Sequence, residues 1–495
     1  MRASGGIAAG LGVLAAVLGA AFSWRPSFWY DEAATVYVSQ RSLPDLARLL
    51  AHQDAVHGVY YLSMHFWFRL FGASEFSARL PSAIAVGVAV AGVVVLAELV
   101  ADRRAAVLSG LICAVLPRLT WAAVEARGYA LTAAVAVWLT VVLLVALRRG
   151  RWFWWVLYAV GVAAAIVVFM DLATLVCAHA LTVLVLRRRA LLPFAGAAVV
   201  GGLLALPAIL EMNEQSGQVG WIPAMNATVL RTVLVYPWFV GTAGAAVLAA
   251  VIVVYGLIAS RSYRTSELLA VAVPWAVLPI VLLVAYSLAA EPMYLDRYVT
   301  FTAPAVALLV GGAIAAVGHN RLGTVALIVA VVAPSVGAYL AQRTPYAKPS
   351  GMDYSAVADY MADNAHPGDC VLFAEKSAFT PTSARVAENI APSAFAGLQD
   401  PGKGKSAVAL GWLWDEQLPI AAVADKLGSC SVLWYVGDVE RSEPATIRHT
   451  SNEVWHLPPY HFEDSKDYHE LVTLGFTVDE SHQFNVSQVV RLRRS

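Results

Sequence analysis

Two adjacent carboxylates, Asp31 and Glu32, are the residues of this sequence best suited to chemistry, because they follow directly on its first long apolar segment. An Asp or Glu carboxylate within hydrogen-bond reach of a hydroxyl can act as a general base and remove the proton. A structural role is the alternative, because acidic side chains also cap the N-terminal turn of a helix, here one over residues 33–40. Which role applies depends on the elements that hold the two side chains.

The composition assigns most of the chain to a membrane. Hydrophobic residues make up 59% of its 495 residues and charged residues only 14%, whereas soluble domains carry about 25% charged residues. A helix needs about 20 apolar residues to cross the hydrocarbon, and about eleven such segments precede residue 341. Their centres lie near Val13, Val90, Ala114, Val135, Val162, Leu181, Leu203, Leu248, Val277, Leu309 and Ile328. We predict an all-α polytopic membrane protein whose first segment is an uncleaved anchor.

Basic residues collect in alternate loops, at 103–104, 148–151, 187–189, 261–264 and 321. The positive-inside rule makes these loops cytoplasmic, together with the N-terminus. The outer loop 24–77, the turns near Glu125, Asp171 and Glu291, the loop 211–226 and everything after residue 341 then face outward. The predicted location is the plasma membrane. Because the net charge is zero, nothing indicates a nucleic-acid partner.

Two domains are predicted, a transmembrane domain over residues 1–341 and an extracytoplasmic domain over residues 342–495. In the outer loop 24–77, residues 44–50 and 59–71 have the apolar spacing of helices that lie in the membrane interface. After residue 342 no segment could span a bilayer, and helical patterns at 354–361 and 418–427 precede strand patterns at 370–373 and 430–435. A β-rich end follows at 476–492, so we predict a small α/β fold.

The cysteines and tryptophans of the outer side allow two interpretations each. Cys370 and Cys430 occupy equivalent positions of two predicted strands in a domain placed outside the cell, where disulfides persist, so they are a bridge or two free thiols. Trp412 and Trp414 either recognise a glycan or belong to the core. In the loop 211–226, Trp221 either stacks on a sugar ring or lies in a plain flexible loop.

Two arginines lie at predicted outer membrane boundaries. Arg127 follows Glu125, and Arg297 follows Asp296. A guanidinium group matches phosphate oxygens with two parallel hydrogen bonds, so both arginines are candidates for phosphate binding. The alternative is a purely structural ion pair with the neighbouring carboxylate.

Several short motifs occur in a characteristic order. Asp31-Glu32 comes first, and Asp54-x-x-His57-Gly-x-Tyr60-Tyr61-Leu62 follows. Next come Phe71-Gly72-x-x-Glu75-x-x-x-Arg79-Leu80-Pro81-Ser82, Glu125-Ala-Arg127-x-Tyr129-Ala130-Leu131 and finally Arg297-Tyr298 before Pro304. In order and topological side the set resembles the GT-C glycosyltransferases, in the branch of the protein O-mannosyltransferases and the lipid A aminoarabinose transferase, and especially actinobacterial mannosyltransferase-like proteins.

The resemblance implies the GT-C fold and an inverting transfer of a sugar from a polyprenyl-phosphate carrier to an acceptor hydroxyl at the outer face. Asp31 aligns with the catalytic carboxylate of the family, and Glu32 is the second candidate. Arg127 and Arg297 would bind the donor phosphate. His57 and Tyr60 resemble the family segment His-Pro-Pro-x-Tyr-Tyr, although Gly58 and Val59 replace the prolines. The other candidate substrate-binding residues are Asp54, Glu125, Tyr129, Asp171, Trp221 and Tyr298.

The partners follow from the same resemblance. The donor is expected to carry mannose, with arabinose as an alternative, and the acceptor is a glycan, a lipid or a protein of the cell envelope. The metal requirement is unknown, although Asp31, Glu32, Asp54 and Asp171 could hold a divalent cation such as Mg²⁺ or Mn²⁺. A lipid-linked-sugar flippase or transporter is the competing class, and a membrane anchor for a sugar-binding outer domain is a third. The polar residues concentrate on one side of the membrane, which favours interfacial chemistry.

Overall fold

The computed structural model describes residues 2–226, 229–264, 266–448 and 454–494. The chain divides into two compact units. The first, which we call the helical unit, comprises Met1–Ser23, Asp54–Ser63 and Phe76–Arg343. The second, which we call the mixed unit, comprises Trp24–Gln53, Met64–Glu75 and Thr344–Ser495. Most of the outer loop therefore packs with the C-terminal segment, whereas the sequence grouped that loop with the transmembrane part.

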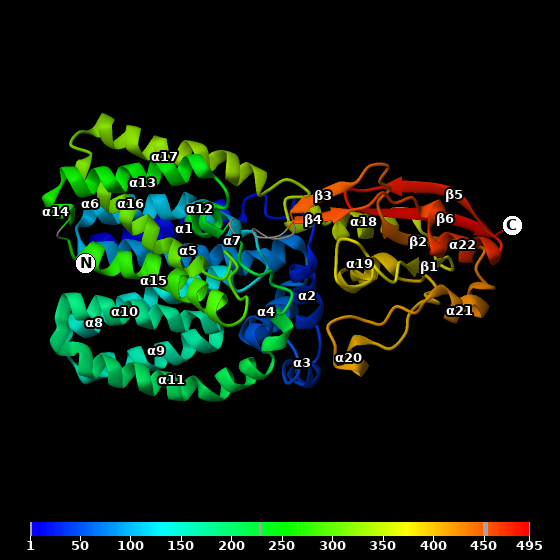
Figure 1. The fold of residues 1–495 in the computed structure, drawn as a ribbon, viewed down its shortest axis with the longest axis horizontal. Coiled ribbons are helices and arrows are strands. Elements are labelled where there is room, and N and C mark those ends of the chain that lie inside the picture. Colours follow the sequence, from blue (N-terminus) through cyan, green and yellow to red (C-terminus); the bar gives the residue numbers. More distant parts are fainter. Residues whose placement is uncertain (1, 227–228, 265, 449–453, 495) are drawn as a thin grey trace. The chain divides into compact units, whose positions relative to one another are not determined.

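The helical unit is a bundle of apolar helices (Figure 1). Each of the predicted segment centres lies in a different helix. These helices are α1 (Arg2–Ala20), α5 (Glu75–Val100), α6 (Arg103–Val115), α8 (Tyr129–Arg149), α9 (Trp152–Val168), α10 (Ala173–Arg187), α11 (Leu191–Glu214), α13 (Ala243–Ala259), α15 (Glu267–Ala289), α16 (Ala303–Val317) and α17 (Arg321–Ala341). Shorter helices are α7 (Pro117–Ala123), α12 (Val229–Phe239) and α14 (Arg261–Arg264).

The number of membrane crossings stays a prediction. Over the described ranges, 6 helical stretches are long and apolar enough to cross a membrane, or up to 8 if each of two bent pairs is one span. One bent pair is α6 and α7, which meet at 57°. Pro117 begins α7, and a proline disfavours the α conformation of the residue before it, so the helix breaks at Leu116. Two further apolar helices, Gly5–Ala20 within α1 and α9, are shorter than these stretches.

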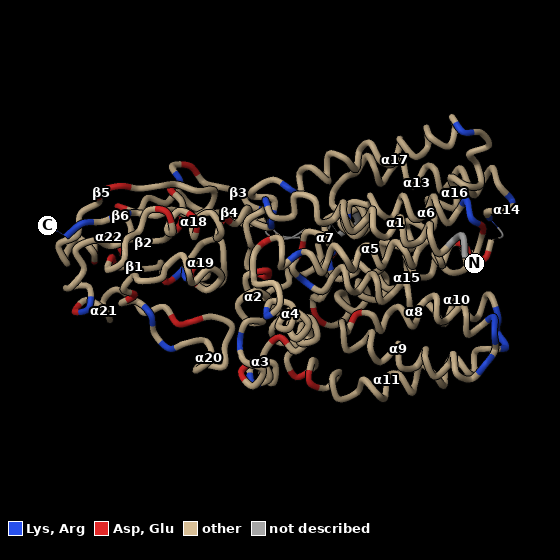
Figure 2. The backbone as a smooth tube through the Cα atoms, turned by 180° about the vertical axis from the view of Figure 1, so that it is seen from behind, with Lys and Arg blue, Asp and Glu red and all other residues tan. Residues whose placement is uncertain are grey.

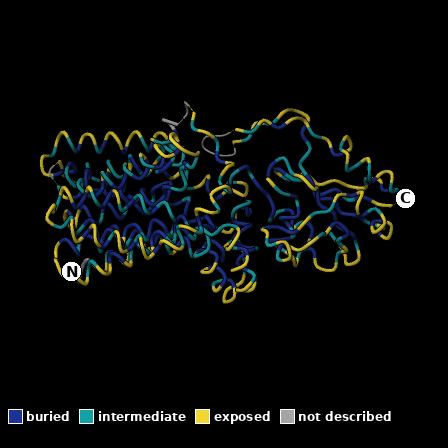
Figure 3. Tube along the Cα trace, turned by 60° about the horizontal axis from the view of Figure 1, so that its bottom comes forward, coloured by how far each residue is buried: buried dark blue, intermediate teal, exposed yellow. Residues whose placement is uncertain are grey.

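The surface of the bundle is apolar, as a lipid-facing surface requires. Figure 3 shows buried residues inside the bundle and exposed ones along its outer helices. Among the exposed side chains are Leu192, Leu203 and Ile258. Inside, small residues let the helices approach: a Cβ atom at Gly311 of α16 would clash with the backbone of Ser109 on α6.

The charges of the helical unit are distributed unevenly along the bundle. Figure 2 shows Lys and Arg gathered at the end that carries α14 and the N-terminus, whereas most Asp and Glu lie toward the other end. The arginine-rich turns thus share one end, as the alternation of loops predicts. Which end faces the cytoplasm stays a prediction.

The mixed unit contains a four-stranded sheet of order β1-β2-β6-β5. Its strands are β1 (Cys370–Phe373), β2 (Val432–Asp438), β5 (Phe476–Gln483) and β6 (Ser487–Arg494). β1 and β2 are parallel, and the other neighbouring pairs are antiparallel. A second sheet pairs β3 (Ala445–Arg448) with β4 (Val454–Leu457). The predicted sheet region is confirmed, and the strand at 370–373 has the predicted bounds.

Helices of the mixed unit come from both ends of the chain. From the C-terminal segment come α18 (Tyr354–Asn364), α19 (Val386–Ile390), α20 (Ala407–Leu410), α21 (Ile420–Leu427) and α22 (Lys466–Thr473). From the outer loop come α2 (Tyr30–Ser39), α3 (Leu43–Leu50) and the second half of α4 (Gly58–Phe71). The two helices predicted in the outer loop are thus present as α3 and α4.

A disulfide joins Cys370 to Cys430, with their Cα atoms 5.8 Å apart. Both cysteines are buried in a core cluster that includes Leu433 and Leu427. The bridge that the sequence left open is therefore present. Trp414 is also a core residue, 5% exposed, and its indole N–H donates to the Tyr30 hydroxyl at 2.8 Å. Trp412 is 57% exposed, so glycan recognition stays a prediction for this residue alone.

Candidate active site

A short 3-10 helix, η1 (Ala55–His57), carries the first candidate residues of the helical unit. Asp54, which precedes it, has φ of 61° in the left-handed region, which Asp tolerates better than most residues. Two glutamine side chains hold this backbone. The N–H of Asp54 donates to Oε1 of Gln218 at 3.0 Å, and the N–H of Ala55 donates to Oε1 of Gln215 at 2.9 Å. Part of the loop 211–226 therefore supports η1.

A chain of hydrogen bonds links Arg127 to Asp54 through Tyr61. Nη1 of Arg127 donates to the Tyr61 hydroxyl at 2.8 Å, and this hydroxyl donates to Oδ2 of Asp54 at 2.7 Å. Arg127 is only 6% exposed and Tyr61 is fully buried. A buried cation needs such partners, because an unpaired charge in a low-dielectric interior is costly. These two hydrogen bonds fix the guanidinium group of Arg127 in one orientation.

Tyr61, for which the sequence predicted no role, contacts three candidate residues, Arg127, Asp54 and His57. The rings of His57 and Tyr61 have centroids 5.9 Å apart. Side chains four residues apart lie on the same face of a helix, so this spacing could have identified Tyr61. The hydroxyl of Tyr60 lies 3.4 Å from the hydroxyl of Ser82. The candidate role of Tyr60 in substrate binding stays a prediction.

Two arginines, Arg127 and Arg297, act electrostatically on His57. Burial lowers the pKa of His57 well below its usual value, and Arg127 and then Arg297 lower it further. The imidazole is therefore neutral near pH 7. Arg127 and Arg297 come from distant parts of the sequence, so their joint effect on His57 means that the fold brings both predicted phosphate-binding arginines to the same region of the helical unit.

Aromatic rings surround Arg297. Its guanidinium carbon lies 5.7 Å from the ring centroid of Trp221 and 5.8 Å from that of Tyr298. Tyr298 stacks on Tyr129 with centroids 6.4 Å apart. Two candidate residues of the sequence, Trp221 and Tyr298, therefore lie beside Arg297, and a third, Tyr129, packs on Tyr298. Cation–π contact orients the guanidinium group without neutralising its charge.

The segment before Arg297 is held by Arg118, which the sequence analysis did not single out. Arg118 is 1% exposed and forms an ion pair with Asp296. Its Nε also donates to the carbonyl of Pro237 at 3.1 Å. An arginine inside an apolar segment is expensive unless it is paired, and this cost is the signal that could have identified it.

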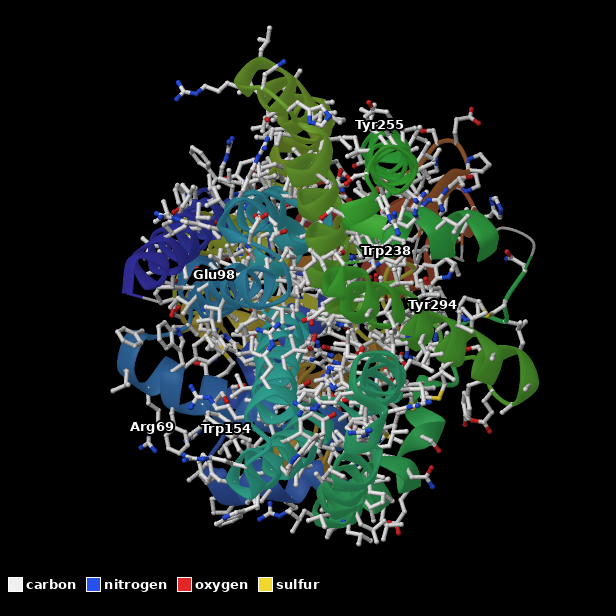
Figure 4. The ribbon with its side chains drawn as sticks, turned by 90° about the vertical axis from the view of Figure 1, so that its left-hand side faces the viewer. Arg69, Glu98, Trp154, Trp238, Tyr255 and Tyr294 are labelled. Carbon is white, nitrogen blue, oxygen red and sulfur yellow. A yellow bond between two sulfur atoms is a disulfide. The ribbon has the colours of Figure 1, made fainter. Side chains whose placement is uncertain are left out.

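An apolar cluster lies behind the same segment. Tyr294 and Val299 are buried with Ile280 and Leu283 of α15, and Trp238 packs against them. Figure 4 shows Trp238 and Tyr294 on the same side of the bundle. Arg297 thus extends from a segment that is fixed by an ion pair and by apolar packing, rather than from a free loop.

The turn that carries Glu125 and Arg127 is held by Ser82. The Ser82 hydroxyl donates to the carbonyl of Glu125 at 2.7 Å and is 3.4 Å from that of Arg127. Glu125 is fully buried. The motif residue Ser82 therefore shapes the turn from which Arg127 extends.

Asp171 lies in a second 3-10 helix, η2 (Met170–Leu172), where its carbonyl accepts from the Thr174 hydroxyl at 2.6 Å. Its substrate-binding role stays a prediction. The ranges that the structure describes contain no group of three or more His, Cys, Asp or Glu side chains arranged to hold a metal ion. The four carboxylates considered as cation ligands therefore do not form such a cluster there.

The mixed unit places Asp31 and Glu32 in different environments. α2 begins at Tyr30, and its N-cap residue Trp29 makes no side-chain cap. The two carboxylates thus lie in the first turn of a helix that begins before them rather than at residue 33, and a structural role at this N-terminal turn stays the alternative. Glu32 is fully buried and pairs with Lys348, Nζ to Oε1 3.2 Å, whereas Asp31 is only partly buried.

Comparisons with known proteins agree with this description. Residues 59–213 match the family model described as Dolichyl-phosphate-mannose-protein mannosyltransferase. The comparison with curated proteins gives no match. Among solved structures, that of ArnT from Cupriavidus metallidurans bound to undecaprenyl phosphate is similar, with a TM-score of 0.57 at 16% identity, over 90% of this chain and 96% of that one.

Two further structures are similar at low identity. Arabinofuranosyltransferase AftD from Mycobacteria has a TM-score of 0.52 at 16% identity, over 98% of this chain and 39% of that one. The oligosaccharyltransferase of Archaeoglobus fulgidus in the apo form has a TM-score of 0.51 at 12% identity, over 87% of this chain and 69% of that one. These similarities confirm the resemblance predicted from the motifs: the chain has the fold of the GT-C glycosyltransferases.

Proposed function

We propose that this protein is an inverting glycosyltransferase that moves a sugar, mannose in the first instance, from a polyprenyl-phosphate carrier to an acceptor hydroxyl at the outer face of the plasma membrane. The observation that carries the proposal is the approach of Arg127 and Arg297 to the neutral His57 in a membrane-embedded unit. Two fixed cations in an apolar setting suit an anionic lipid headgroup.

The leaving group explains why two arginines are needed. As the bond between the anomeric carbon and the phosphate oxygen breaks, negative charge grows on the phosphate. Donors that are already oriented toward this charge stabilise the transition state, and removing one typically costs about 100- to 1,000-fold in kcat. The neutral imidazole of His57 adds a hydrogen-bonding group without adding a further positive charge.

Asp31 is proposed as the general base. Its carboxylate takes the proton of the acceptor hydroxyl while the hydroxyl oxygen forms a bond to the anomeric carbon on the face opposite the phosphate. The polyprenyl phosphate leaves with the electron pair of the broken bond. Glu32 is a poorer candidate, because it is fully buried and its carboxylate is paired with Lys348.

The sugar is proposed from the matched family, whose name specifies mannose. The name of the mycobacterial relative specifies an arabinofuranosyl group, so arabinose is the sugar to compare. The acceptor is proposed to be a glycan, a lipid or a protein of the cell envelope. The chemistry written above uses no bound cation.

The test is transfer from radiolabelled decaprenyl-phosphate mannose and decaprenyl-phosphate arabinose by the purified full chain, with an envelope membrane fraction as acceptor. Wild type should transfer one sugar, and Asp31→Asn should transfer none while binding the donor normally. Asp363→Asn, on an exposed position of α18, is the matched control and should be as active as wild type. If Asp31→Asn transfers as well as wild type does, the proposed base is wrong. Translocation of donor without transfer would favour a flippase.

A further inference from the structure

The C-terminal segment holds the start of α2, the helix that carries Asp31. The first N–H groups of a helix have no partner within it, and α2 has no side-chain cap. Residues 345–355 contact the start of this helix and the residues just before it. The N–H of Ser27 donates to the carbonyl of Pro345 at 2.8 Å, and the N–H of Tyr30 lies 3.3 Å from the sulfur of Met352.

A reciprocal pair of hydrogen bonds tightens this junction. The N–H of Phe28 donates to the hydroxyl of Ser355 at 3.1 Å, and the N–H of Ser355 donates to the hydroxyl of Ser27 at 2.9 Å. The segment just before Asp31 is therefore fixed at several points along its backbone, all within the mixed unit.

The segment 345–355 is in turn fixed to the end of the sheet. Asp353 is fully buried, and its Oδ2 accepts from the N–H groups of Val486 and Ser487 at 2.7 and 3.0 Å. The side-chain amide of Asn485 donates to the carbonyl of Gly351 at 2.6 Å. The sheet thus supports residues 345–355, and these residues support α2.

The ion pair between Lys348 and Glu32 joins the same two segments. The two side chains are 2% and 0% exposed, and Nζ lies 3.2 Å from Oε1. Glu32 is the residue after Asp31 in the same helical turn. A buried carboxylate that loses the cation paired with it tends to protonate or move toward water, and either change rearranges that turn.

We propose that Lys348 is a positioning residue for the transfer reaction, which holds the first turn of α2, and so the carboxylate of Asp31, through its buried ion pair with Glu32. The inference rests on the proposed function, in which Asp31 is the base. It assigns the C-terminal segment a part in placing that base, in addition to any acceptor binding.

The experiment compares the full-length wild type with Lys348→Met, Glu32→Gln and the double variant, using the donor assay above. Displacing a catalytic group by about 1 Å can cost about 100-fold in rate. Lys348→Met should therefore lower kcat between about 10- and 100-fold per folded molecule, with the donor KM changed less than about threefold. The double variant removes both charges and should recover most of that loss.

Two controls separate positioning from general instability. Lys426→Met, on an exposed position of α21, should leave kcat unchanged. Ser355→Ala removes a hydrogen bond to the same segment without exposing a buried charge, so it should fold and should lower kcat several-fold with the donor KM unchanged. Ser355→Ala keeps the test decisive if Lys348→Met fails to fold.

The outcomes distinguish this inference from the proposed function. A folded Lys348→Met with wild-type kcat would overturn the inference and leave Asp31 as the base. If Lys348→Met does not fold and Ser355→Ala has wild-type kcat, the inference is also overturned. Asp31→Asn with wild-type activity would instead overturn the proposed function, on which the inference rests.

Discussion

Breaking the disulfide between Cys370 and Cys430 should destabilise the mixed unit by about 4 kcal/mol. The bridge closes a loop of 60 residues. In the chain-entropy treatment, a cross-link over such a loop removes about 14 cal/mol/K from the unfolded chain, or about 4 kcal/mol at 25 °C. Because each 1.4 kcal/mol is a factor of ten, the unfolded fraction of this unit should rise about 1,000-fold.

The position of the bridge makes the effect local to the sheet. Cys370 begins β1, and Cys430 precedes β2, its parallel neighbour. For a unit of this size, a loss of about 4 kcal/mol lowers the thermal midpoint by about 8–16 °C. Reduction of the wild type and substitution of both cysteines by alanine should agree, apart from a further loss in the alanine variant for the buried sulfur atoms removed.

The assay is thermal unfolding of the full chain in detergent with and without reductant, followed by pulse proteolysis. Cys177→Ala, which removes an exposed cysteine of α10, is the control and should not change the midpoint of the mixed unit. An unchanged midpoint after complete reduction would refute the loop-entropy reasoning. Labelling of Cys370 and Cys430 by a thiol reagent in freshly lysed cells, before any reduction, would contradict the predicted extracytoplasmic side.

The polar cluster of the helical unit gives three further predictions. Arg127→Lys should lower kcat/KM, measured from initial rates of sugar transfer, about 100-fold, because an ammonium group cannot form the two parallel hydrogen bonds of a guanidinium group. Tyr61→Phe should lower kcat/KM less than about tenfold in the same assay. Because burial and then two arginines hold the His57 pKa below 6.5, wild type should lose up to about 1.4 kcal/mol of stability per pH unit as the pH falls below 6.5. His57→Gln should lose less, as thermal midpoints at pH 7.5 and 5 will report. Arg118→Met should cost about 3 kcal/mol in unfolding experiments and raise the donor KM, because it removes the ion pair with Asp296. Arg321→Met, at an exposed position, should do neither.

Local patterns in the sequence predicted most of the fold. The apolar segments predicted the helices, because a run of about 20 apolar residues has few other uses. The alternation of arginine-rich loops agrees with their collection at one end of the bundle. The strand over residues 370–373 was predicted with its observed bounds, because a short apolar run between turn residues is a local signal.

The sequence could not predict the contacts that form between distant segments. Nothing near Lys348 indicates an ion pair with Glu32, and nothing near Arg118 indicates Asp296. The grouping of the outer loop with the C-terminal segment is equally non-local. The contact between His57 and Tyr61 is by contrast a local one, because it follows from the register of the helix.

Helix geometry explains why two adjacent carboxylates can differ in function. Successive side chains of an α-helix point about 100° apart, so Asp31 and Glu32 in one turn of α2 cannot share an environment. Glu32 points into the mixed unit, where burial without a cation would be costly and Lys348 supplies one. A residue committed to such a pair cannot exchange protons with an acceptor without breaking it. Asp31 is only partly buried, so an acceptor hydroxyl can reach its carboxylate more easily than that of Glu32, and we therefore propose Asp31 as the base and Glu32 as the residue that fixes its helix.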